Sequence, residues 1–153
     1  MEGPSYELHD TILFLVVGSW NYVLQRLIGR CIGSGCDKGA IIGLDGELWT
    51  PPIQDFVLRL TDDQIRSIAS GMNNFKDYYT GDKVIRVGGK IYKVIRKNDV
   101  KGIVKGKLDG DGYIIMQKTK TAVIMAHAIE GSILANTDEA VDYVAQYLKR
   151  YGY

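Results

Sequence analysis

The residues that could carry chemistry in this sequence are two cysteines, two histidines and one glycine-rich loop. Cys31 and Cys36 are separated by four residues, and no second pair of cysteines or histidines stands near them to complete a zinc site. His9 and His127 lie far from both cysteines in the sequence. We therefore predict that the protein binds no metal and that its two thiols are reduced, as is usual in the cytosol.

The loop from Gly33 to Gly39 has the composition of a phosphate-binding loop but not its context. Its spacing differs from the dinucleotide fingerprint, and it leads into a predicted strand, whereas those motifs need a helix N-terminus to hold phosphate. His127 lies in an apolar run, where a buried structural histidine is commoner than a general base. Without a nucleophile motif or a Walker-type loop, the sequence predicts no catalytic residues, no cofactor and no enzyme.

The charges are distributed unevenly. The formal net charge is +1, but residues 83–120 hold eleven lysines and arginines against three aspartates. This block therefore carries a charge of +8, and the rest of the chain carries −7. Such asymmetry is typical of proteins that meet an acidic partner or an anionic lipid surface. The alternative is a strand region whose solvent face happens to carry lysine.

The aromatic residues are mostly of the two types that combine an apolar ring with a polar tip. The chain has two Trp and ten Tyr but only three Phe. Trp20 and Trp49 are 29 residues apart, and the last part of the chain places tyrosines at i, i+4 and i+8, namely Tyr143, Tyr147 and Tyr151. Such a column usually packs against a neighbouring element. The hydroxyl groups of these tyrosines also suit proline-rich ligands, which need aromatic rings to stack on and hydrogen-bond donors for their free carbonyl groups.

Length and hydropathy indicate one domain. The 153 residues are 46% hydrophobic and 24% charged, which allows a buried core and a hydrated surface. The longest apolar run, residues 12–17, is too short to span a bilayer. Residues 1–11 contain three acidic residues and no lysine or arginine, so a secretory signal is not predicted. We expect a cytoplasmic protein.

Three helices are predicted from apolar spacing and caps. The first has Ser19 as its N-cap, and Gly29 together with the glycine-containing residues 33–35 ends it. The second begins with the capping box Thr61 to Gln64 and runs to about residue 75. The third begins at Asn136, with Glu139 closing a second capping box, and its apolar stripe consists of Val141, Val144, Ala145 and Leu148.

Between the helices, short apolar runs alternate with turn residues. Predicted strands cover 40–43, 47–50, 84–87, 90–96, 103–108, 113–118 and 121–128. Tight turns such as Gly88-Gly89 join them, so the sheet should be a single antiparallel meander with helices on its faces, an α+β fold. Residues 1–18 form an amino-terminal extension to a domain at 19–153. The extension is either a flexible tail or a segment that folds back over the aromatic residues.

Five segments, in order and over residues 19–153, resemble the profilin family. They are SWNYV at 19–23, AIIGLDG at 40–46 followed by LW at 48–49, GG at 88–89 with VIR at 94–96, KTK at 118–120, and YL at 147–148 with GY at 152–153. The resemblance implies the same α+β fold, with the amino- and carboxy-terminal helices together on one face of the sheet and the shorter helix on the other. It also implies a monomeric, non-enzymatic actin regulator that binds no nucleic acid.

In profilins the terminal helices and the hairpin tryptophan form a groove for proline-rich segments. The resemblance places six residues there: Trp20, Tyr22, Trp49, Tyr147, Leu148 and Tyr153. Tyr22 departs from the family pattern, which spaces its Trp and Tyr three apart rather than two. Residues two apart on a helix do not share a face.

The resemblance also implies a surface for monomeric actin and, from the basic block, phosphoinositide head groups as a third ligand. The actin-binding positions would be Lys93, Arg96, Lys105, Lys107 and Glu139. The family commonly has Lys at the position of Glu139, so the sign of the charge is reversed here. The runner-up interpretation is a sensory or trafficking domain of similar layout that binds a small molecule or lipid in an internal pocket. Such a domain has no need of aromatic residues on its outer helices.

Overall fold

A six-stranded antiparallel sheet organises the molecule. The computed structural model of the protein describes residues 20–30, 35–78 and 83–153. Along the sheet the strand order is β1-β6-β5-β4-β3-β2, so every strand after β1 pairs with its neighbour in sequence. The strands are β1 (Cys36–Gly43), β2 (Val84–Val87), β3 (Lys90–Asn98), β4 (Ile103–Leu108), β5 (Gly112–Lys118) and β6 (Ala122–Ile129). The predicted meander is confirmed.

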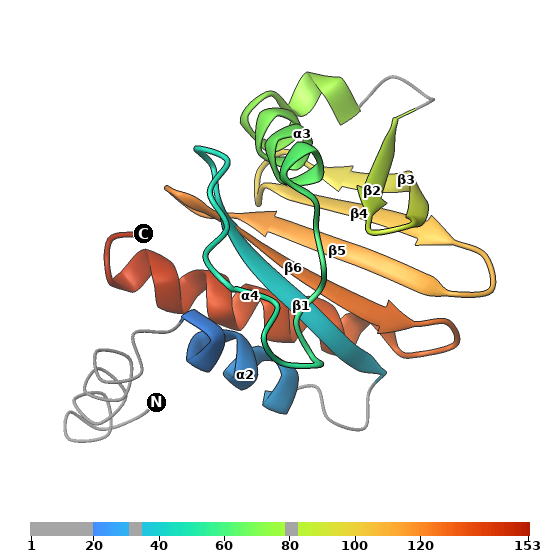
Figure 1. Ribbon diagram of the computed structural model, residues 1–153, viewed down its shortest axis with the longest axis horizontal. Coiled ribbons are helices and arrows are strands. Elements are labelled where there is room, and N and C mark those ends of the chain that lie inside the picture. The colour runs from blue at the N-terminus through green and yellow to red at the C-terminus, as the bar shows by residue number, and fades with distance from the viewer. Residues whose placement is uncertain (1–19, 31–34, 79–82) are drawn as a thin grey trace.

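Helices cover both faces of this sheet. They are α2 (Trp20–Arg30), α3 (Asp62–Asn73) with the short 3-10 helix η1 (Phe75–Tyr78), and α4 (Leu134–Arg150). Helices α2 and α4 lie together on one face, and α3 lies on the other (Figure 1). None of the helices in the described ranges is long and apolar enough to cross a membrane. The predicted extension, residues 1–18, and the predicted cap at Ser19 lie outside the described residues.

The sheet separates two apolar cores because side chains alternate along each strand. Ile41 and Ile124 point towards α2 and α4 and join one cluster. Their neighbours Ile42 and Val123 point towards α3 and join the other. Strands buried on both faces read as continuous apolar runs in the sequence, as in the run from Ala122 to Ala128.

The first predicted hairpin forms only in part. Strand β1 begins at Cys36, earlier than predicted, and residues 47–50 return beside it with a single bridge between Ile42 and Leu48. The Gly43 amide donates to the Glu47 carbonyl at 2.7 Å, and the Trp49 amide donates to the Ile41 carbonyl at 3.0 Å. Pairing stops there because Pro51 and Pro52 follow, and proline has no amide hydrogen to donate.

One predicted cap is confirmed and another is wrong. Thr61 and Gln64 form the expected capping box at the start of α3. Helix α4, however, begins at Leu134, and its N-cap residue Ile133 makes no side-chain capping hydrogen bond. A tight turn after β6, with Gly131 at φ 88°, starts the helix before Asn136 can cap it. Asn136 and Glu139 therefore lie within the first turns of α4.

Candidate functional site

Three aromatic rings from distant parts of the chain meet on the face that carries α2 and α4. The Trp20 and Trp49 rings lie 4.5 Å apart between centroids and are tilted by 31°. Tyr153 packs edge-on against both, at 4.9 Å from Trp20 and 5.8 Å from Trp49. The cluster is assembled from the first helix, the loop after β1 and the carboxy-terminal segment. We call these three residues the ring cluster.

The loop after β1 holds Trp49 in place. A Cβ atom at Gly43 would lie 2.9 Å from Nε1 of Trp49, so only glycine lets the indole approach this strand so closely. The next residue, Thr50, is fully buried, and its hydroxyl oxygen accepts a hydrogen bond from the Ile41 amide at 3.0 Å. On α2, the Asn21 side chain donates to the Pro51 carbonyl at 3.0 Å and to Gln54. These bonds fix the loop against both β1 and α2.

The turn between β5 and β6 holds Tyr153. The carbonyl oxygen of Tyr153 accepts hydrogen bonds from the Thr119 hydroxyl at 2.7 Å and the Thr121 amide at 3.1 Å. Its own amide donates to the Leu148 carbonyl at 3.0 Å. Leu148, a predicted groove residue, has a side chain only 1% exposed in the core beneath α4. Its side chain therefore packs in the core, and its carbonyl anchors Tyr153 of the ring cluster.

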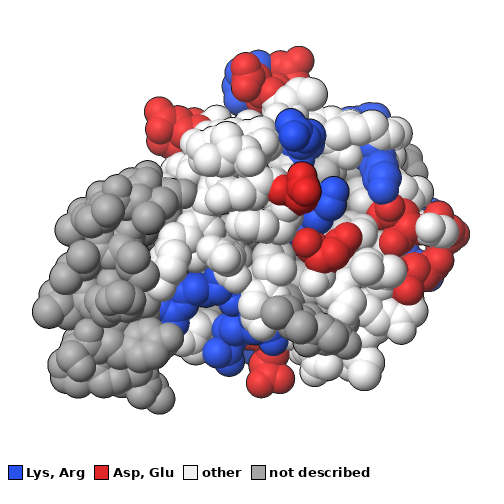
Figure 2. Space-filling view, turned by 60° about the horizontal axis from the view of Figure 1, so that its bottom comes forward, with Lys and Arg blue, Asp and Glu red and all other residues white. Residues whose placement is uncertain are grey.

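The tyrosine column of α4 lies along the seam with α2. The Arg30 guanidinium lies 3.6 Å from the centre of the Tyr143 ring, and Arg26 lies 5.4 Å from that of Tyr147. Figure 2 shows basic side chains gathered on the lower part of the face turned to the viewer. Cation–π contact of this kind contributes on the order of 0.5–1 kcal/mol at exposed sites. The two inner tyrosines therefore help pack the helices.

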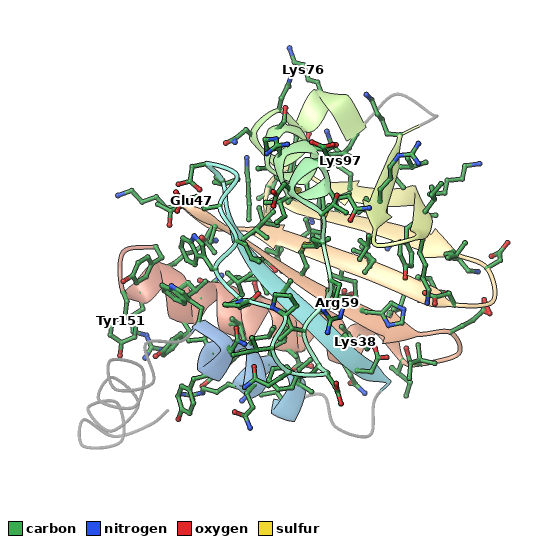
Figure 3. All side chains as sticks on the ribbon, in the orientation of Figure 1. Lys38, Glu47, Arg59, Lys76, Lys97 and Tyr151 are labelled. Carbon is green, nitrogen blue, oxygen red and sulfur yellow. The ribbon has the colours of Figure 1, made fainter. Side chains whose placement is uncertain are left out.

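The outer end of the column is open to solvent. Tyr151 is 42% exposed and packs edge-on against Tyr147 at 5.1 Å, at the end of α4 nearest the carboxy terminus (Figure 3). Tyr22 is half-buried, and it is not among the rings described in contact with Trp20. Residues two positions apart in a helix are about 200° apart around its axis, so Trp20 and Tyr22 face different sides of α2.

The four basic residues predicted for the second surface form two cross-strand pairs. Lys93 of β3 lies opposite Lys107 of β4, and Arg96 lies opposite Lys105. The register shifts between Val94 and Arg96, so β3 contains a bulge there. Because the bulge inserts one residue, Lys93 and Arg96, three apart in sequence, share a face of the sheet. The structure thus brings all four together.

Acidic side chains neutralise part of this basic group. The Nζ atom of Lys105 lies 2.6 Å from Oδ2 of Asp138 at the start of α4, and Lys107 lies 3.6 Å from Asp109. Glu139, the fifth predicted residue, lines the same groove as Arg96 and Lys105. The fifth residue therefore lies across this groove from two of the other four, Arg96 and Lys105.

A buried polar network on the α3 side of the sheet was not predicted. His127 is 7% exposed, with Nδ1 2.6 Å from Oδ1 of Asp37 and Nε2 2.8 Å from Oδ2 of Asp111. An ionised carboxylate can only accept a hydrogen bond. The two contacts can therefore both be hydrogen bonds at the same time when each ring nitrogen of His127 carries a proton. Asp111 also accepts from Tyr92 and Lys90. The expectation of a structural histidine agrees with this burial, but its two partners come from β1 and from the turn between β4 and β5, and no local sequence pattern links them to His127.

The network shifts the ionisation of two of its members. Burial, and then the hydrogen bond to Asp111, raises the pKa of Tyr92 above its usual range. Burial would also raise the pKa of Asp111, but hydrogen bonds from Lys90, Tyr92 and His127 outweigh it and hold that pKa well below its usual range. The network floors a cleft of about 570 Å³, whose rim includes Lys38 and Arg59 (Figure 3).

Comparison with known proteins identifies the family. A sequence model of the family described as Profilin matches residues 18–153. A profilin of Strongylocentrotus purpuratus is 34% identical over 86% of this chain and 96% of its own length. The chain belongs to the profilin family. Profilins are binding proteins and not enzymes, as predicted. The runner-up interpretation, a sensory or trafficking domain, is thereby set aside.

Solved profilins share the fold. Profilin IB of Acanthamoeba castellanii superposes with a TM-score of 0.70 at 24% identity, covering 88% of this chain and all of that one. LokiProfilin2, solved in complex with rabbit actin, has a TM-score of 0.65 at 16% identity over 84% of this chain and 93% of its own. Mouse profilin IIa, solved with a double repeat from the FH1 domain of mDia1, has a TM-score of 0.62 at 19% identity over 88% and 99%.

Proposed function

We propose that this profilin binds monomeric actin and proline-rich segments, and so regulates actin polymerisation in the cytoplasm. The observation that carries the proposal is the ring cluster of Trp20, Trp49 and Tyr153, held in contact by hydrogen bonds from two separate turns. Trp20 and Trp49 pack against the core on one side and remain partly exposed on the other. They are what a polyproline helix requires for stacking.

The proline-rich ligand would lie on the ring cluster and along the exposed end of α4. Tyr153 and Tyr151 are both more than a third exposed, and their hydroxyls can donate to ligand carbonyls. Tyr147 lies beneath Tyr151 in the same column. The mouse relative of the same fold, solved with an FH1 repeat, supports this assignment of ligand class. Leu148 and Tyr22 belong to the proposed groove as a support and a flank.

The actin-binding surface would comprise β3, β4 and the start of α4. The paired basic residues lie beside Ile91 and Ile95, which are 46% and 51% exposed. An exposed apolar strip flanked by charge is typical of protein interfaces. The relative solved with rabbit actin supports actin as the partner. The same basic residues offer phosphoinositide head groups a peripheral site, because phosphates pair well with clustered Lys and Arg.

Titration with a proline decamer, followed by tryptophan fluorescence, tests the first half of the proposal. The two tryptophans of the chain are both in the ring cluster, so a bound peptide should change the emission. Sequestration of monomeric actin in a polymerisation assay tests the second half. We further propose that residues 19–153 suffice for both activities and that residues 1–18 are an extension to them.

A further inference from the structure

A groove of about 380 Å³ separates the β3–β4 region from the beginning of α4, and its two walls carry opposite charges. The sheet wall is basic and the helix wall is acidic. The charged residues that line it are Arg96, Lys101, Lys105, Asp138, Glu139 and Asp142. A groove of this kind would bind neither a purely acidic nor a purely basic surface well.

Two of the three acids have partners within the chain, although Oδ1 of Asp138 is buried with no hydrogen-bond partner among the described residues. Asp138 pairs with Lys105, whose side chain is 14% exposed. Asp142 accepts a hydrogen bond from the buried Gln117 amide at 3.0 Å, and this bond is the main cause that lowers the pKa of Asp142. Lys101 is close enough to contribute to the same shift. These groups set the shape and charge of the groove, and they are not available to a partner without breaking a bond.

Glu139 and Arg96 are different. Both are exposed and line the same groove, yet within the described ranges neither forms an ion pair. Glu139 does not cap α4, since the helix begins five residues earlier at Leu134. The helix therefore gives no structural reason for an acid at this position. One unpaired acid and one unpaired base thus face outwards from opposite walls.

We propose that Glu139 pairs with a lysine or arginine side chain of the actin partner, while Arg96 and Lys93 pair with its carboxylates. The inference rests on the proposed function. It adds that the actin surface carries a basic group opposite Glu139 and acidic groups opposite Arg96 and Lys93. An exposed ion pair contributes little. Here Ile103 on the sheet side and Ala135 on the helix side, which line the groove, would be covered in the complex and help exclude water from the bound interface. A charge that loses its water without gaining a partner weakens binding. Glu139 therefore favours actins that carry a basic residue opposite it.

Charge reversal at Glu139, measured with two actins, tests the inference. Monomeric actin from the source organism of this chain and monomeric rabbit actin are each titrated with unaltered protein, Glu139→Gln and Glu139→Lys. With the organism's own actin, Glu139→Gln should weaken binding severalfold and Glu139→Lys about tenfold or more, which corresponds to about 1.4 kcal/mol. With rabbit actin, Glu139→Lys should bind more tightly, because the resemblance to profilins implies a lysine at this position.

Glu47→Lys is the matched control. Glu47 is also exposed, makes no ion pair within the described residues, and lies in the loop after β1, far from α4's first turns in Figure 3. It should leave both affinities unchanged. Equal or tighter binding of Glu139→Lys to the organism's own actin would overturn the inference while leaving actin binding itself intact. If the unaltered protein bound neither actin, the proposed function would fail, and this inference with it.

Discussion

Thr119 and Tyr153 are joined by a hydrogen bond of 2.7 Å, from the threonine hydroxyl to the carbonyl oxygen of the closing tyrosine. Thr119 is 6% exposed in the turn between β5 and β6. The turn therefore controls where the Tyr153 ring lies against Trp20 and Trp49. A residue with no contact to a ligand thus becomes a determinant of the ring cluster.

Thr119→Val should weaken proline-decamer binding about three- to tenfold. It keeps the shape of the side chain but removes the donor to Tyr153 and the acceptor of the Ala122 amide, and a typical hydrogen bond contributes about 0.5–1.5 kcal/mol. Thr121→Val is the control, because its hydroxyl contact to the same oxygen is longer, at 3.3 Å. Isothermal titration with the decamer compares the two. An equal effect of both variants would mean that the Thr119 bond has no special part in positioning Tyr153.

Trp20→Ala should abolish measurable proline-decamer binding. Trp20 makes the two shortest ring contacts of the cluster, at 4.5 and 4.9 Å between centroids, and truncation of a central aromatic anchor typically costs about 2–4 kcal/mol. Actin affinity should be unchanged, because α2 packs on β1, and β3 and β4 lie towards the opposite end of the sheet. If the variant binds the decamer as well as the unaltered protein does, the groove assignment is wrong.

Gly43→Ala should displace the Trp49 indole and lower decamer affinity. The new Cβ would lie 2.2 Å from Oδ1 of Asp45 and 2.9 Å from Nε1 of Trp49, closer than real Cβ contacts allow. Gly89→Ala is the matched control, because a Cβ there meets no atom within 4 Å. Decamer titration and the tryptophan emission maximum should change for the first variant alone. A Gly43→Ala protein with unaltered emission and affinity would show that the loop adjusts without cost.

Arg96→Glu should weaken both actin and phosphoinositide binding, actin by about tenfold or more. The substitution places a carboxylate opposite Lys105 and beside Glu139, so it removes a cation and adds repulsion towards acidic partners. Lys76→Glu, an equal change of charge in η1 at the α3 side of the molecule (Figure 3), is the control. Sedimentation with phosphoinositide-containing vesicles and an actin titration measure the two ligands. Equal loss in both variants would indicate that only net charge matters.

Asp111 should make the fold sensitive to acid. Its pKa is held well below the usual range in the folded chain, so ionised Asp111 stabilises the fold above the ordinary carboxyl pKa of about 4. That contribution is lost as the pH falls from about 4 towards the lower folded-state pKa. Urea unfolding at pH 7 and pH 3 should show a smaller difference for Asp111→Asn than for the unaltered protein. The conservative Asp109→Asn, an exposed acid in the same turn, should keep the full difference.

Local patterns predicted most of the fold, since they depend on a few adjacent residues. The capping box at Thr61, the apolar stripe of α4 and the glycine turns each formed where expected. The start of α4 was missed because a turn closed by Gly131 prevails over the capping preference of Asn136. Side-chain capping preferences amount to about 1 kcal/mol, which tertiary connections easily exceed.

The candidate site, like the fold, could be predicted from the sequence only in part. The ring cluster could be anticipated because family resemblance named Trp20, Trp49 and Tyr153 together. The bulge in β3 could not, because register is decided by two strands at once, and the alternation of Lys93, Val94 and Ile95 alone implies a different face for Arg96. The His127 network was equally hidden, as Asp37 lies 90 residues away in sequence.

Helix α4 carries a part of both proposed surfaces at its two ends. Glu139 stands in its early turns and Tyr151 closes it, twelve positions later, which at about 1.5 Å per residue places them on the order of 18 Å apart. Groups so far apart rarely perturb one another, so the free energies of binding at the two ends should add. Helix α4 thus holds the two proposed binding surfaces apart, so that binding at one does not exclude binding at the other. An actin subunit held at one end of α4 can remain there while the other end is docked on a proline-rich assembly factor.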